Sequence, residues 1–249
     1  MVITSPSVVA HIVAVRKTYG DASPSTALDG VSLSIVDGEL TAVIGPTGAG
    51  KSTLLKVVGG LDTAIEGHAY LGDVDITGMR EDDIGPLRRR DVSFVWPLDL
   101  VPTLDVISNV RLPFLRSGRP MRPEDDDRVR ELVASFGLQE QRFRFPHELT
   151  CGQERRAAIA RALASSPRLV LADEPTDDLD ACVGAEVVAL LRASTRQYGQ
   201  SILMGTHDPY AASQADRVIF LSGGVIVGDR RRLDVDDITR MMAEMDQVT

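Results

Sequence analysis

The chain has 249 residues, of which 43% are hydrophobic and 25% charged, enough for one globular α/β domain with a subdomain. Its 27 basic and 36 acidic side chains give a formal net charge of −9 and a pI near 5.0. This balance argues against a surface that coats nucleic acid and against direct adsorption on anionic lipid, because both need a basic face.

The first third of the chain has mostly β-strand patterns. Residues 8–16 are typical of a strand, and residues 27–36 alternate apolar and polar side chains. Asp37-Gly38 predicts a hairpin turn after the second run, and Gly72-Asp73 predicts another within residues 67–76. We therefore expect an antiparallel β subdomain in this part of the chain.

The rest of the chain alternates short apolar runs with helical patterns. Strands are predicted at residues 92–95, 168–172, 201–206 and 218–221, and helices at 154–164, 183–194, 209–215 and 235–245. Strands separated by helices predict a parallel sheet. The Arg88-Arg89-Arg90 run is interpreted as solvated. Residues 97–165 are helical in pattern throughout, which predicts an inserted helical subdomain.

A glycine-rich run between a buried strand at residues 40–44 and an apolar helical run from Leu54 fits the pattern G-x-x-x-x-G-K-[ST]. Its residues are Gly45, Pro46, Thr47, Gly48, Ala49, Gly50, Lys51, Ser52 and Thr53. The glycines let consecutive N–H groups face one point at a helix N-terminus, which attracts phosphate. Lys51 is expected to reach the β- and γ-phosphates of a nucleotide, and the Ser52 hydroxyl to bind Mg²⁺.

Two acids follow the apolar run 169–172, at the edge of a parallel sheet where ligands bind. We expect Asp173 to face the Mg²⁺ and Glu174 to face the attacking water. His207 follows the predicted strand 201–206 at the same edge, so we expect it to contact the γ-phosphate. Strand ends often carry charge, but downstream of a phosphate loop the functional interpretation is favoured.

Two further features each have a structural and a functional interpretation. Thr150 and Gln153 form a T-x-x-Q capping box, and the helix start that they cap contains Gly152, so it can also meet a phosphate. Tyr19 can stack on adenine or be an ordinary surface tyrosine.

The chain shows no signal peptide, and no apolar run approaches the length of a membrane span. Cys151 and Cys182 lack metal-binding spacing, so reduced thiols are expected. A cytoplasmic protein is therefore predicted; if it serves a membrane, it does so as a peripheral subunit on the inner face.

The motifs, in order, resemble those of an ABC-type ATP-binding subunit, and the resemblance covers nearly the whole chain. They are Tyr19, Gly45–Thr53, Leu149–Gln153, Leu171–Pro175, Leu179-Asp180 and His207, with residues 153–163 similar to the signature helix. Residues 171–176 and 102–104 look most like the branch that serves lipoprotein release and macrolide or peptide export.

The resemblance implies an α/β P-loop NTPase fold, with a RecA-like parallel sheet, an N-terminal antiparallel β subdomain and an inserted helical subdomain. It implies one ATP-binding domain over residues 1–249. The expected parts are a nucleotide-binding core with its β subdomain (1–96 and 166–229), the helical subdomain (97–165) and a tail helix (230–249).

The resemblance also implies a mechanism with ATP and Mg²⁺. Two ATP-binding subunits, as a homo- or heterodimer, face each other head to tail. Each ATP lies between the phosphate loop of one subunit and Thr150, Gly152 and Gln153 of the other. Glu174 polarises water, and Asp180 couples the two sites. A membrane permease docks on the helical subdomain and provides the only membrane contact; nucleic acid is not an expected partner.

The sequence departs from the family pattern in two places. Trp96 is followed by Pro97 where the family has a glutamine, for which Asp99 is the candidate substitute. Cys151 replaces a signature glycine, and its side chain would hinder the approach of the γ-phosphate. Three hypotheses therefore stand: a transport ATPase, a degenerate or regulatory ATP-binding half, and a soluble ABC ATPase of DNA repair or translation.

Overall fold

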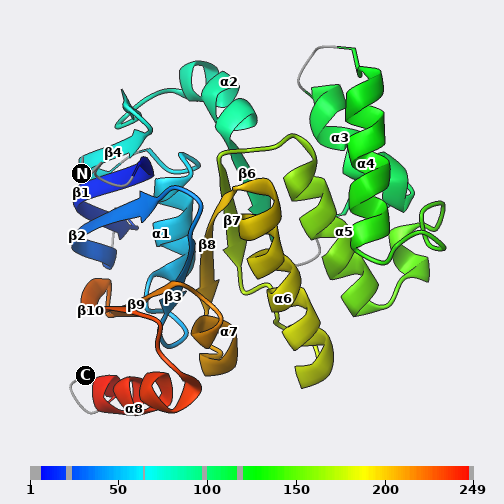
Figure 1. Ribbon diagram of the computed structural model, residues 1–249. Helices are drawn as coiled ribbons and strands as arrows, with labels where there is room; N and C mark the ends of the chain where they lie inside the picture. Colours follow the sequence, from blue (N-terminus) through cyan, green and yellow to red (C-terminus); the bar gives the residue numbers. More distant parts are fainter. Residues whose placement is uncertain (1–6, 21–23, 64, 97–99, 117–119, 247–249) are drawn as a thin grey trace, which may run out of the picture.

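The computed structural model describes residues 7–20, 24–63, 65–96, 100–116 and 120–246, which form two β-sheets and the helices around them (Figure 1). The strands are β1 (Val8–Tyr19), β2 (Ser25–Val36), β3 (Leu40–Ile44), β4 (Glu66–Leu71), β5 (Val74–Asp75), β6 (Val92–Val95), β7 (Leu169–Asp173), β8 (Ser201–Thr206), β9 (Arg217–Ser222) and β10 (Val225–Arg231). The helices are α1 (Lys51–Val58), α2 (Glu81–Asp91), α3 (Val106–Arg116), α4 (Pro123–Ser135), α5 (Cys151–Ala164), α6 (Ala181–Tyr198), α7 (Pro209–Ser213) and α8 (Val235–Asp246), with the 3₁₀ turn η1 (Pro146–Glu148).

The first sheet is antiparallel and has the order β2-β1-β4-β5. The β4–β5 pair is the hairpin predicted around Gly72-Asp73, with Leu71 opposite Val74. The second sheet has the order β10-β9-β3-β8-β7-β6. Its strands β9, β3, β8, β7 and β6 run parallel, as expected from the alternation of strands and helices, and β10 joins the edge antiparallel to β9.

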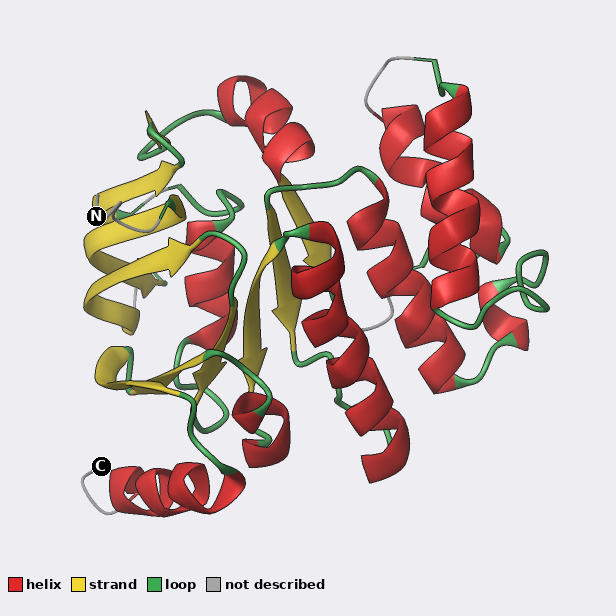
Figure 2. Cartoon of the chain, viewed as in Figure 1, coloured by secondary structure: helices red, strands yellow, loops and turns green. Residues whose placement is uncertain are grey.

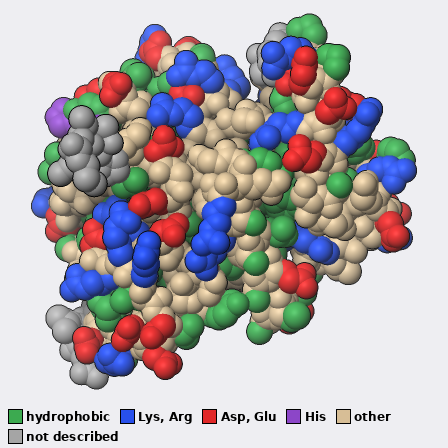
Figure 3. All heavy atoms as spheres, viewed as in Figure 1, with side chains coloured by type: hydrophobic (Ala, Val, Ile, Leu, Met, Phe, Trp, Pro, Cys, Tyr) green, Lys and Arg blue, Asp and Glu red, His purple; other side chains and the backbone are tan. Residues whose placement is uncertain are grey.

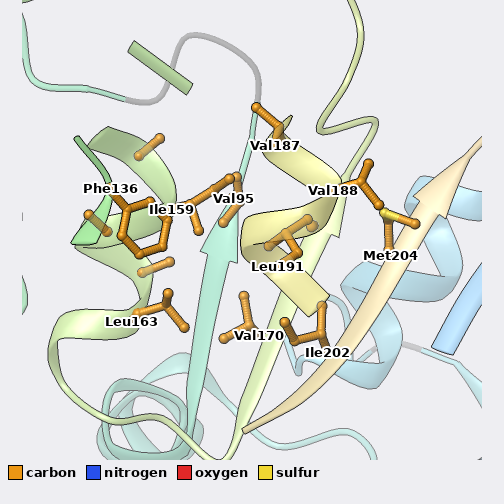
Figure 4. Packing of buried hydrophobic residues seen from close by; sticks show 14 of the residues in the cluster. Val95, Phe136, Ile159, Leu163, Val170, Val187, Val188, Leu191, Ile202 and Met204 are labelled. Carbon is orange, nitrogen blue, oxygen red and sulfur yellow. The ribbon is translucent and has the colours of Figure 1, made fainter. Parts of the chain in front are cut away.

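The strands of the second sheet are buried on both faces, because their side chains alternate between two hydrophobic cores. In β7, Val170 and Ala172 point into one core and Leu169 and Leu171 into the other. The first core continues into the helical part of the molecule, where Phe136 and Leu163 belong to the same cluster as Val170 (Figure 4). The second core lies between the second sheet, α1 and the antiparallel sheet.

The helices α3, α4 and α5 gather on one side of the molecule, away from the antiparallel sheet (Figures 1 and 2). All three lie within the range in which the sequence predicts helices. Just before α3, the Asp105 carboxylate accepts a hydrogen bond from the Ser108 N–H at 2.8 Å, as a helix-capping aspartate does.

One local prediction was wrong, and another holds only in part. The Asp37-Gly38 turn exists but makes no hairpin, because β2 belongs to the antiparallel sheet and β3 to the other. The arginine run is the last turn of α2 and is solvated only in part: Arg89 and Arg90 are exposed, whereas the Arg88 side chain is largely buried. Arg88 donates to the Gly60 carbonyl at 2.9 Å and pairs with Glu81.

Candidate nucleotide site

The loop between β3 and α1 has little room for side chains. A Cβ at Gly45 would lie 2.0 Å from the Leu221 carbonyl oxygen, and one at Gly50 would lie 2.3 Å from that of Ala27. Gly50 also has a φ of 103°, which favours glycine. The helix α1 that follows has no side-chain cap and no acid in its first turn, so its N–H groups are not engaged by its own residues. This is the geometry of an anion cradle.

The Lys51 side chain lies folded over this loop. Its Nζ donates to the carbonyl oxygens of Gly45 (2.8 Å) and Pro46 (3.1 Å) and lies 3.2 Å from Glu174 Oε1. The ammonium group is thus held at the mouth of the cradle, next to the acids predicted from the sequence. Its three contacts are all to oxygen atoms, so phosphate oxygens can replace them.

Asp173 ends β7 and is only 8% exposed. Burial raises the pKa of Asp173, and a hydrogen bond with Ser52 opposes that rise. One of its oxygen atoms makes no hydrogen bond within the described part of the chain. A buried oxygen without a partner, beside a hydroxyl, suits Mg²⁺, which takes one or two protein oxygens and completes its shell with phosphate and water. Asp173 and Ser52 therefore fit the metal.

Glu174 and His207 lie together at the same edge. The backbone of Glu174 has a φ of 45°, a strained value for a residue with a side chain, and its N–H donates to the Gly205 carbonyl at 2.9 Å. One Glu174 carboxylate oxygen accepts from the His207 N–H at 3.2 Å and lies 3.0 Å from His207 Nδ1. The carboxylate is therefore aimed by contacts on two sides, from Lys51 and from His207.

Sequence reasoning missed Gly205 at this edge. A Cβ at this position would lie 3.1 Å from Asp173 Oδ1, so glycine leaves room for the acid. A glycine inside a strand is the signal that could have identified it.

Tyr19 lies at the end of β1, with 43% of the residue exposed. Burial of the rest of the ring raises the pKa of its hydroxyl, and the side chain of Thr53, in the first turn of α1, opposes that rise. The structure thus brings Tyr19 beside the phosphate loop, although the two are far apart in sequence. The hydroxyl also donates to Asp62 at 3.0 Å, a residue that the sequence gave no reason to single out.

The start of α5 is built as the capping-box pattern predicts. Thr150 Oγ1 accepts from the Gln153 N–H at 3.3 Å, and Gln153 Oε1 accepts from the Thr150 N–H at 3.0 Å. Gly152 packs on the neighbouring helix α6, since a Cβ there would lie 2.5 Å from Val183 Cγ1. Cys151 is exposed.

Asp180 caps α6, with one carboxylate oxygen that accepts from the N–H groups of Cys182 and Val183, both at 3.0 Å. Thr150, Gly152, Gln153 and Asp180 thus all have structural roles of their own.

The structure divides the predicted site residues into two groups. Lys51, Ser52, Asp173, Glu174 and His207 meet at one place, and Tyr19 borders it. The residues at the start of α5 do not join them: Figure 1 shows α5 beside α3 and α4, with α6 and the strands β7 and β8 between it and α1. Pro97 and Asp99 lie outside the described residues.

Comparison with known proteins decides the family. The model of the family described as ABC transporter matches residues 28–177. The lipoprotein-releasing system ATP-binding protein LolD of Anaeromyxobacter dehalogenans is 40% identical over 217 residues, which are 86% of this chain and 91% of LolD. The chain belongs to the ABC transporter family.

Two further relatives agree with this membership. The macrolide export ATP-binding/permease protein MacB of Rhodospirillum rubrum is 39% identical over 84% of this chain, which spans only 32% of MacB. The dimeric structure of the ATP-binding cassette MJ0796 in a post-hydrolysis state, bound to ADP and Pi, superposes with a TM-score of 0.82 at 32% identity, over 90% of this chain and 99% of that one. MJ0796 comes from Methanocaldococcus jannaschii.

The chain is therefore an ABC-type ATP-binding subunit and ATPase with a P-loop NTPase fold, of the branch that contains LolD and MacB. These matches confirm the resemblance noted in the sequence, and they do not support the alternative of a degenerate ATP-binding half. Within the described ranges, no helix is both long enough and apolar enough to cross a bilayer.

Proposed function

We propose that this subunit hydrolyses ATP in a head-to-tail pair and thereby drives a membrane permease. The main observation behind the proposal is that the predicted site residues lie in two separate places in the chain. One group of residues can hold a triphosphate and activate a water molecule to attack it, while the glycine-bearing start of α5 lies apart from this group in the same chain. A second subunit that presents its own α5 would complete each site.

In this proposal each side chain has one task. Lys51 exchanges its carbonyl and carboxylate contacts for the β- and γ-phosphates, and Ser52 and Asp173 hold Mg²⁺, which supplies charge neutralisation for the phosphates. Glu174 accepts a proton from the attacking water, and His207, already 3.0 Å from that carboxylate, keeps it oriented and meets the γ-phosphate.

The remaining predicted residues have the tasks that the family resemblance suggests. Tyr19 stacks on adenine; Thr150, Gly152 and Gln153 meet the ATP of the partner; Asp180 couples the two sites. We keep residues 97–165 as the helical subdomain and 230–249 as the tail, with residues 1–96 and 166–229 as the core.

The permease contact is proposed at a cleft of about 450 Å³ between α2 and α3. Phe94 and Trp96 line it with stacked rings 5.6 Å apart, and the lining also includes Arg89, Arg116 and Arg161 beside the Arg88–Glu81 ion pair. Figure 3 shows Lys and Arg side chains on both sides of a hollow at the top of that view. A basic cleft in a chain of net charge −9 favours an acidic segment of the partner. The chain would then work in the cytoplasm, as a peripheral subunit on the inner face of the membrane.

A complementation experiment tests the shared site. Lys51→Ala removes the phosphate ligand of a chain's own site, and Cys151→Glu places a negative charge where the chain faces the partner's triphosphate. Glutamate is favourable in the first turn of a helix, so the second variant is expected to fold. Each variant alone should be inactive, whereas a mixture should regain activity, because the mixed pair contains one site that is intact on both sides.

The matched control replaces Cys151→Glu with Cys182→Glu, which puts the same charge in the first turn of α6. This control alone should keep substantial activity. Phosphate release from the Lys51→Ala and Cys151→Glu mixture that equals the sum of the two separate proteins would show that no site is shared, and the proposed arrangement would be wrong.

A further inference from the structure

Asp62 connects two residues of β1 to the helix of the phosphate loop. It lies just after α1, and its side chain is 19% exposed. One carboxylate oxygen accepts from Lys17 Nζ at 2.7 Å, and the other accepts from the Tyr19 hydroxyl at 3.0 Å. Hydrogen bonds to a charged carboxylate are shorter and stronger than neutral ones, so this carboxylate restrains both side chains.

Lys17 and Tyr19 also contact each other. They are two residues apart on β1 and so point to the same face of the strand. Lys17 Nζ lies 5.0 Å from the centre of the Tyr19 ring, within the range of a cation–π contact. Each of the three side chains therefore contacts the other two. Asp62 holds the tyrosine at its hydroxyl, and Lys17 holds it at its ring.

This set is fixed to the phosphate-binding element. The Asp62 N–H donates to the Lys56 carbonyl at 3.2 Å, near the C-terminal end of α1. The ring is therefore held relative to the helix that starts at Lys51. An aromatic side chain that is already ordered loses less conformational entropy when a ligand stacks on it.

We infer that Asp62 is a positioning residue for the nucleobase: it holds the Tyr19 ring in place before the nucleotide arrives. The inference rests on the proposed function, in which Tyr19 stacks on adenine. Because the tyrosine hydroxyl is engaged by the Asp62 carboxylate, the ring contributes to base binding through its face and not through its hydroxyl.

The test compares the dissociation constants of Mg-ATP and of magnesium tripolyphosphate, which has the phosphates but no base. Asp62→Ala should raise the dissociation constant of Mg-ATP roughly 3- to 10-fold, the range expected when one side chain must be ordered on binding. Tripolyphosphate binding should not change, and KM for ATP should rise while kcat at saturating ATP is kept.

Two related variants extend the test. Asp62→Asn keeps one oxygen acceptor and should recover part of the ATP affinity. Tyr19→Phe removes the hydroxyl. Adding Asp62→Ala to this variant should weaken the binding of ATP little further, because the two changes break the same contact.

Asp29→Ala is the matched control. It removes another carboxylate that pairs with a basic residue of β1, Arg16 at 2.7 Å, but both side chains are about half exposed, and both nucleotide and tripolyphosphate binding should stay as in the wild type. Equal weakening of both ligands by Asp62→Ala would mean a general structural role and would overturn the inference. Unchanged ATP affinity in Asp62→Ala, with a loss in Tyr19→Ala, would also overturn it but leave the proposed function intact. If the wild type binds neither ligand, the proposed function itself fails.

Discussion

The phosphate edge of the second sheet and the start of α5 are both predicted to touch ATP, but they differ in how complete they are. At the phosphate edge, Lys51 and His207 are already in contact with Glu174, and a buried Asp173 oxygen is free to bind a metal. At the start of α5, Cys151 is exposed, and the contacts that Thr150 and Gly152 make are those of an ordinary capped and packed helix.

This difference has a physical consequence. The charged groups of the phosphate edge hold one another in place, so this part of the site is organised within one chain. The start of α5 can meet a phosphate only when a second molecule brings the phosphate to it. The distance between α1 and α5 within one chain is therefore the structural reason why the proposed site needs a second subunit. In the proposed pair, a change at the phosphate edge would act on the chain's own ATP, and a change at Cys151 would act on the ATP of the partner.

The largest expected effect is at the phosphate edge. Glu174→Gln keeps the size of the side chain but removes the base, so kcat for ATP hydrolysis should fall by about 10²–10⁴-fold. ATP should still bind, because Lys51 and the loop are untouched. Phosphate release and nucleotide binding measure the two effects separately. Glu131→Gln on the exposed surface of α4 is the matched control, and unchanged phosphate release by Glu174→Gln would remove this residue from the mechanism.

A smaller effect, of opposite sign, is expected at α5. Cys151→Gly removes the Cβ and sulfur that are predicted to hinder the γ-phosphate, so turnover should rise, by up to about 10²-fold if one preorganised contact is restored. Cys182→Ser, which changes the chain's other thiol, should leave turnover as it is. A wild-type rate equal to that of Cys151→Gly would show that the side chain at this position does not hinder the reaction.

The smallest effect concerns pH. Since burial raises the pKa of Asp173, protons compete with Mg²⁺ at this carboxylate at a higher pH than they would at an exposed aspartate. As pH is lowered, the Mg²⁺ dependence of ATP binding should therefore weaken before ordinary aspartates titrate.

The raised pKa of Asp173 also affects the stability of the metal-free fold, which depends on pH in the opposite direction to Mg²⁺ binding. Between the ordinary and the raised pKa the folded chain binds more protons at Asp173 than the unfolded chain, so stability without metal falls as pH rises through that window. Asp173→Asn should remove this contribution and the Mg²⁺ dependence together. Thermal unfolding measured against pH checks the prediction, and an identical pH profile in Asp173→Asn would contradict it.

The structure brings the predicted residues of the phosphate edge together, and the sequence could predict this grouping because its signals are local. The glycines from Gly45 to Gly50 serve one loop, and Asp173 and His207 each follow a short apolar strand. Once those strands are assigned to one parallel sheet, their ends must meet. The capping box of Thr150 and Gln153 is equally local, and the structure contains both of its hydrogen bonds.

The failures involve information that is not local. The Asp37-Gly38 pair specifies a turn but not which sheet the next strand joins. Helix α2 was not recognised because Gly85 and Pro86, both helix breakers, lie within it. The contact of Asp62 with Tyr19 spans 43 residues and involves no motif, so only the packed structure reveals it.

The most direct test of the central claim is the binding of Mg-ATP to the purified chain and to Lys51→Ala. If the loop from Gly45 to Ser52 holds the triphosphate, the wild type binds Mg-ATP and the loss of the Lys51 ammonium weakens binding by about 10-fold or more, the cost of one charge-assisted contact. Lys56→Ala, at the exposed end of α1, should bind like the wild type. Equal affinity of the wild type and Lys51→Ala, or no binding by either, would contradict the claim.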